Sequence, residues 1–74
     1  MQTDEATLRK TVAKNIAAYR KAHHDTQLDL ATKLNYSDKS VSKWERAESA
    51  PDMGNLIALA DLYEVTLDEL LRVS

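Results

Sequence analysis

Residues 26–45 read TQLDLATKLNYSDKSVSKWE, and they are the most informative stretch of the chain. Two short helical patterns lie within it, and a turn of about three residues separates them. The first pattern begins after Thr26, a residue type that caps helices well. Its apolar positions are Leu28, Leu30, Ala31 and Leu34. The second pattern begins after Ser37 and turns Val41 and Trp44, three residues apart, toward the interior.

The outward side of the second pattern is unusually polar for so short a helix. It carries Asp38, Lys39, Ser42 and Lys43. Such groups hydrogen-bond to base edges and to phosphate oxygens. Two helices joined by a tight turn, the second with a polar face, predict a helix-turn-helix over residues 27–46. In that geometry the helix over about 38–46 lies in the major groove of double-stranded DNA.

Length and composition favour a single all-α domain over residues 1–74. With 74 residues, of which 43% are apolar, the chain is near the lower size limit for one apolar core. It has one Gly, one Pro and no Cys, so a disulfide framework or thiolate metal site is excluded. The N-terminal stretch MQTDEATLRK is charged, and no long apolar run follows, so we expect a cytoplasmic protein without membrane contact.

The net charge of −2 argues at first against a nucleic-acid ligand, but the charges are unevenly distributed. Residues 1–46 carry nine Lys and Arg against six Asp and Glu, whereas residues 47–74 carry one against six. The first part can therefore present a basic surface to a duplex. The alternative is that the acidic part is simply a solvated surface. In either case we expect weaker nonspecific affinity for DNA than a basic relative would show.

The remaining chain predicts three further helices. The first begins around residues 3–5 and ends near residues 22–24, with an apolar stripe of Leu8, Val12, Ile16 and Tyr19. Another runs from about residue 53 to 63 after the candidate cap Asp52, and its expected buried residues are Leu56, Ile57, Leu59 and Ala60. The last follows a capping box of Thr66 and Glu69, with a hydrophobic staple formed by Val65 and Leu70.

Three motifs, in this order, resemble the Cro/repressor-type (Xre-like) helix-turn-helix transcriptional regulators. They are TQxxLA at 26–31, SxxSVSKWE at 37–45 and VTLDELL at 65–71. The resemblance extends over about residues 12–71. It implies a compact bundle of five helices, the lambda-repressor-like fold, which binds DNA through its second and third helices. It also implies a repressor that acts by occupying an operator.

The expected DNA-binding residues are Gln27, Ser37, Asp38, Lys39, Ser42, Lys43 and Arg46. By the resemblance, Gln27 occupies a position that contacts a phosphate; otherwise it is an ordinary exposed helix residue. Lys39 and Lys43 lie four residues apart and reach one groove together, unless they only form a solvated face. The Ser42 hydroxyl between them can donate or accept, while Ser40 is better explained by a bond to the preceding turn.

Asp38, Arg46 and Trp44 each allow two interpretations. Asp38 can accept a hydrogen bond from a cytosine amino group, or merely complement the dipole at the N-terminus of its helix. Arg46 can bind a phosphate, or only complement the dipole at the C-terminus. Trp44, together with Tyr36, could stack on bases, but its spacing from Val41 favours a place in the core.

The resemblance makes three statements about structure. An acidic residue at position 45 pairs with an arginine of the first helix, and Arg20 occupies the matching position. Asn35 stands where the family has Gly, and Asn tolerates a left-handed conformation. Ala47 also replaces a usual Gly, so either a left-handed Ala costs about 1 kcal/mol or the turn differs.

No residue pattern indicates catalysis, a metal site or a cofactor, and we expect a protein that is not an enzyme. His23 and His24 are adjacent and better suited to the C-terminal end of the first helix. The competing function is a protein-interaction module, such as an antitoxin-like partner of a toxin. The acidic balance, Asp38 and the acidic residues in the loop 48–52 favour that alternative.

One recognition helix covers few base pairs, so we expect a homodimer on a palindromic operator with half-sites about 34 Å apart. The apolar residues available for self-association are Leu67, Leu70, Leu71 and Val73. Leu67 and Leu70 are better explained as residues that close the core of the monomer, which leaves Leu71 and Val73 as the interface candidates.

Overall fold

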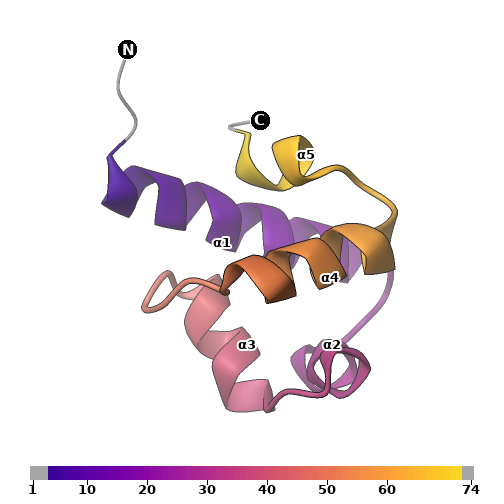
Figure 1. The fold of residues 1–74 in the computed structure, drawn as a ribbon. Helices are drawn as coiled ribbons and strands as arrows, with labels where there is room; N and C mark the ends of the chain where they lie inside the picture. The colour runs from indigo at the N-terminus through magenta and orange to yellow at the C-terminus, as the bar shows by residue number, and fades with distance from the viewer. Residues whose placement is uncertain (1–3, 73–74) are drawn as a thin grey trace.

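The computed structural model describes residues 4–72, and most of them lie in helices. The helices are α1 (Glu5–Ala22), α2 (Gln27–Leu34), α3 (Asp38–Glu45), α4 (Met53–Tyr63) and α5 (Leu67–Leu71). Within residues 4–72 there is no strand. The long α1 and α4 form the middle of the molecule, α2 and α3 lie on one side of them, and α5 lies on the other (Figure 1). The all-α, five-helix prediction is confirmed.

Each of these five helices begins at a side chain that accepts a backbone hydrogen bond from the third helical residue. The caps are Asp4, Thr26, Ser37, Asp52 and Thr66. The predicted capping box of Thr66 and Glu69 is present, and a second box joins Thr26 to Asp29. Side-chain caps of this kind contribute about 1 kcal/mol each, so the sequence itself fixes where the helices start.

Four helices end at a left-handed residue that is not glycine. The residues are His24, Asn35, Ala47 and Glu64, with φ between 55° and 60°. After α3 the N–H of Glu48 donates to the carbonyl of Lys43 at 2.9 Å, and the N–H of Ala47 donates to Trp44 at 3.2 Å. This pair of bonds is the Schellman motif. The turn after α3 therefore has the geometry that a glycine usually provides, and Ala47 adopts the left-handed conformation despite its Cβ atom.

The core collects side chains from all five helices. Its buried members are Val12, Ile16, Leu30, Ala31, Val41, Trp44, Leu59, Ala60, Tyr63 and Leu70. The Trp44 side chain is 4% exposed, so the prediction that it belongs to the core is confirmed and stacking on bases is excluded. The half-exposed Tyr36 packs against it, with ring centroids 5.6 Å apart.

Three apolar residues lie farther out than predicted. Leu28 is 61% exposed because the buried side of α2 is made by Leu30, Ala31 and Leu34, and residue 28 points away from that side. Ile57 is 47% exposed for the same reason on α4, and Leu8 lies at the edge of the core near the start of α1. In addition, α3 ends at Glu45, one residue earlier than predicted, and Arg46 is its C-cap.

Asn15 is the one buried polar residue among those described, and the sequence analysis did not identify it. Its side-chain amide donates to the carbonyls of Leu70 and Arg72, both at 2.8 Å. The last carbonyls of a helix need such partners, and α5 ends in extended backbone without a left-handed cap. Asn15 on α1 thus satisfies the C-terminal end of α5 and attaches it to the bundle.

The strained turn after α3 makes a prediction about stability. Ala47→Gly should raise the free energy of unfolding by about 1 kcal/mol, because glycine adopts φ near 60° without a steric cost. Ala18→Gly, the same chemical change at an exposed position inside α1, should lower it by about 1 kcal/mol. Urea denaturation measures both variants. Two shifts of the same sign would contradict the assignment of strain to Ala47.

Candidate nucleic-acid interface

The outward side of α3 forms a shallow depression of about 310 Å³ together with the first residue of α2. Its lining residues are Gln27, Asp38, Lys39, Ser42, Lys43 and Arg46, and we call them the α3 face. The opposite side of the same helix carries the buried Val41 and Trp44. Six of the seven residues expected to bind DNA thus lie on one surface, because α3 is amphipathic and only two turns long.

Ser37 is the seventh residue, and the structure does not bring it into the α3 face. Its hydroxyl oxygen accepts the backbone N–H of Ser40 at 3.2 Å and lies 3.1 Å from the Ser40 hydroxyl. The Ser37 hydroxyl is therefore engaged in capping the N-terminus of α3. Ser40 completes this local arrangement, in line with its expected bond to the preceding turn.

Arg20 and Glu45 form the ion pair that joins α1 to α3. Arg20 Nε donates to Glu45 Oε2 at 2.6 Å and Arg20 Nη2 donates to Oε1 at 3.0 Å. Their side chains are only 12% and 8% exposed. Hydrogen bonding to the carboxylate raises the pKa of Arg20 above its usual value. A bidentate pair shielded from water in this way fixes the rotation and height of α3 relative to α1.

Gln27 extends the same network to α2. Its Nε2 atom donates to Glu45 Oε1 at 3.1 Å, which holds the Gln27 side chain against the C-terminal end of α3. An amide nitrogen carries two N–H groups, so a second one remains for a phosphate oxygen. The contact with Glu45 thereby orients the residue that the resemblance assigns to the DNA backbone.

Asp25 is a second junction, which the sequence analysis missed. Its carboxylate accepts hydrogen bonds from Lys33 at 2.9 Å and from the Tyr63 hydroxyl at 3.2 Å, and its backbone carbonyl accepts one from Arg20. The bonds from Lys33 hold the pKa of Asp25 below its usual range, while burial raises the pKa of Tyr63. No sequence spacing reveals this junction, since Tyr63 lies 38 residues away.

The cations of the α3 face differ in their partners. Among residues 4–72, neither Lys39 nor Lys43 forms an ion pair, so both ammonium groups are available to a ligand. The guanidinium of Arg46 instead contacts Glu48 and Ser42. Asp38 stands exposed at the first position of α3, where its charge complements the helix dipole.

His23 makes only local contacts at the end of α1 in the described structure. His23 Nδ1 lies 2.9 Å from the carbonyl of Tyr19 at the end of α1, and its ring lies beside that of Tyr63. Across the described part of the chain, no three His, Cys, Asp or Glu side chains gather where a metal ion could bind. Within the same residues, no helix is long and apolar enough to cross a membrane.

Comparisons with known proteins agree with this geometry. A family described as helix-turn-helix matches residues 16–70. The cryptic phage CTXphi transcriptional repressor RstR of Vibrio cholerae is 37% identical over 59 residues, which are 80% of this chain and 53% of that protein. The transcriptional regulator DicA of Escherichia coli is 41% identical over 54 residues, 73% of this chain and 40% of its own. The chain spans about half the length of such relatives.

Two solved structures share the fold. The P22 c2 repressor, crystallised with the synthetic operator 9T, superposes with a TM-score of 0.78 at 32% identity, covering 85% of this chain and 96% of that one. The hypothetical transcription factor NHTF from Neisseria superposes with a TM-score of 0.84 at 26% identity, covering 99% and 84%. The lambda-repressor-like arrangement of the five helices is therefore shared over nearly the whole chain.

The buried network predicts a large effect on stability. Glu45→Ala removes the partner of both Arg20 and Gln27, and we expect the free energy of unfolding to fall by about 3–5 kcal/mol. The double variant Arg20→Met/Glu45→Met should lose less than the single one, because no charge is left buried alone. Guanidinium denaturation compares the two. A loss below about 1 kcal/mol in Glu45→Ala would mean that the pair behaves as a surface ion pair.

Proposed function

Because this chain belongs to the helix-turn-helix family, whose members share the motif found at residues 27–46, we propose that it binds specific sequences of double-stranded DNA as a transcriptional repressor. Membership in the family confirms the resemblance to Xre-like regulators. In this proposal residues 1–74 act as one DNA-binding domain, and α3 enters the major groove. Because its proposed ligand is DNA, we also propose that the protein is located in the cytoplasm.

The observation that carries the proposal is the α3 face. A rigid, amphipathic helix presents two lysines without ion pairs among the described residues, a serine hydroxyl and a carboxylate on one outward side. These are groups that read base edges, and the buried ion pair beneath them holds the helix in place. The similarity to the P22 c2 repressor, whose structure contains an operator, supports the same function.

The contacts divide into two kinds. Lys39 and Ser42 lie three residues apart on the outward side of α3, and we assign them to base edges, with Asp38 beside them at the helix start. Gln27, Lys43 and Arg46 lie around this centre and are assigned to phosphates. Phosphate contacts place the helix in register, whereas base contacts select the sequence. Repression would follow from occupation of the operator.

A second candidate function is a protein-interaction module, such as an antitoxin-like partner of a toxin. The observation that favours it is the acidic half of the chain, together with Glu48 at the rim of the α3 face. Binding to random duplex DNA distinguishes the two, because a DNA-binding domain shows an affinity that falls as salt rises. Absence of any such binding at low salt would favour the protein partner.

The division of contacts predicts different effects on binding. Lys39→Ala or Ser42→Ala should change which sequences are selected, at a cost of about 1–3 kcal/mol at the affected base pair. Gln27→Ala should weaken binding to all sequences alike, because a phosphate contact carries no sequence information. Selection of bound duplexes from a random pool measures both. A Lys39→Ala variant that selects the wild-type sequences would refute this placement of the reading surface.

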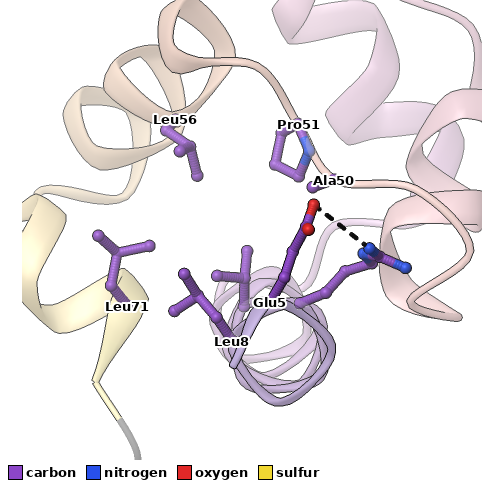
Figure 2. Close-up of a pocket in the computed structure, with 8 residues that line it drawn as sticks. Glu5, Leu8, Ala50, Pro51, Leu56 and Leu71 are labelled. Atoms are coloured by element: carbon purple, nitrogen blue, oxygen red, sulfur yellow. Dashed lines mark ion pairs between the residues drawn. The ribbon is translucent and has the colours of Figure 1, made fainter. Parts of the chain in front are cut away.

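We further propose that the protein pairs on DNA through an apolar groove of about 220 Å³, drawn in Figure 2. Leu8, Leu56 and Leu71 point into it from α1, α4 and α5, and Ala50 and Pro51 close it on the side of the α3–α4 loop. Leu70 is fully buried in the monomer, as expected, and Leu71, an expected interface residue, is 37% exposed. Leu67 packs against the core, and Val73 lies outside the described residues.

The proposed occupant of this groove is a second copy of the chain. The groove offers both a hollow and exposed leucines, so two copies related by a two-fold axis can insert into each other. The ion pair of Glu5 and Arg9 at its edge, 3.6 Å apart, supplies one charge of each sign for exchange across that axis. The loop 46–52 leads directly from α3 to the groove, so pairing there brings two recognition helices onto one duplex.

Pairing predicts a change in stoichiometry. Measured by mass in solution, the wild type should place two copies on a palindromic duplex, and Leu71→Lys should bind as one copy because a charge replaces the apolar contact. Ala18→Lys adds the same charge on an exposed part of α1 outside the groove and should still bind as two. A strict 1:1 complex of the wild type on a palindrome would rule out this paired arrangement.

A further inference from the structure

Arg46 is the one cation of the α3 face that is already neutralised within the described protein. Its Nε atom donates to Glu48 Oε2 at 2.7 Å and its Nη2 atom donates to Oε1 at 3.3 Å. Its third nitrogen, Nη1, donates to the hydroxyl oxygen of Ser42 at 2.9 Å. All three guanidinium nitrogens are thus engaged on the surface that the proposed function assigns to DNA.

The turn after α3 holds Glu48 in position for this contact. The N–H of Glu48 is bonded to the carbonyl of Lys43, so its backbone is fixed against the last turn of the helix. From there the carboxylate reaches back over two residues to Arg46. Both side chains are about half exposed, at 56% and 54%, so water and a DNA phosphate can reach the pair.

Two other acids lie at or near the α3 face, and neither pairs with one of its cations in the described residues: Asp38 has no ion pair there, and Glu45 is held away from the face. Glu45 belongs to the buried pair with Arg20 and is therefore not available to compete for a cation of the face. Glu48 pairs with a cation that lines the face itself. A phosphate and a carboxylate bind the planar guanidinium in the same bidentate way, so only one of them can occupy Arg46 at a time.

We propose that Glu48 is an intramolecular competitor of DNA, which occupies Arg46 in the free protein and is replaced by a phosphate on binding. This inference rests on the proposed DNA-binding function. Replacement leaves Glu48 exposed near the phosphates, so Arg46 contributes less to affinity than a partner-free arginine would. Glu48 thereby weakens binding to DNA of any sequence while base readout by Lys39 is unaffected.

Glu48→Gln should therefore increase affinity for a duplex of random sequence by about 1.5- to 5-fold per bound protomer, the range of an exposed ion pair. The logarithm of the binding constant should also fall more steeply with the logarithm of salt concentration, by up to about one unit of slope. Fluorescence anisotropy over a salt series measures both quantities. The melting temperature serves as a check that the variant folds as the wild type does.

Arg46→Gln and the double variant Arg46→Gln/Glu48→Gln separate competition from general repulsion. If Glu48 acts through Arg46, Glu48→Gln raises affinity in the wild type and changes it by less than about 1.5-fold in the Arg46→Gln background. Asp68→Asn is the matched control. Asp68 lies on α5, across the molecule from α2 and α3 (Figure 1), and forms another exposed ion pair with the C-cap residue Arg72. This variant should leave affinity nearly unchanged.

Each other result overturns the inference. Equal gains from Glu48→Gln in both backgrounds would show that the carboxylate only repels phosphates, and no gain would show that Arg46 does not exchange partners. In both cases DNA binding by the wild type stands. A wild type that binds no duplex even at low salt would contradict both the proposed function and the competition by Glu48.

Discussion

The ion pair of Arg20 and Glu45 is the interaction that holds the proposed DNA-binding surface in place. It lies almost out of water between α1 and α3, and Gln27 joins it from α2. A charge pair in such a place contributes little net stability compared with apolar packing, yet it is costly to break. Its geometry is also directional, because the planar guanidinium donates its two N–H groups to the carboxylate oxygens in one plane. The pair therefore determines which side of α3 faces outward, while Trp44 on the other side supplies the packing.

The ends of the helices are the second constraint, and none of the left-handed residues that end the described helices is a glycine. Side-chain caps begin all five described helices, and Schellman turns end four of them with His, Asn, Ala or Glu in the left-handed region. The single glycine, Gly54, lies inside α4, where glycine weakens a helix. The chain therefore accepts backbone strain of about 1 kcal/mol at several turns to keep them short. The turn after α3 also fixes Glu48, which links backbone geometry to the charge of the proposed interface.

Features that depend on residues close in sequence could be predicted, and features that depend on distant residues could not. The caps at Thr26, Ser37 and Thr66 follow from local hydrogen bonding, and the core position of Trp44 follows from its three-residue spacing to Val41. The pair of Arg20 and Glu45 came from the resemblance, since nothing local joins residues 25 apart. The bonds from Asn15 to the end of α5 and from Tyr63 to Asp25 join residues 38 to 57 positions apart and leave no periodic signal. The exposure of Leu28 was missed because a two-turn helix gives too few residues to define its buried side.

In the proposed function α3 is held by the buried ion pair and is the surface that meets DNA. Titration of uniformly ¹⁵N-labelled protein with a duplex, followed by amide chemical shifts, locates the binding surface residue by residue. The largest changes are expected at Gln27 and over residues 38–48, with smaller ones where two copies pair, in the first half of α1 and at Leu56 and Leu71. Changes centred on α1 and α4, with α3 unaffected, would contradict the proposed function of α3.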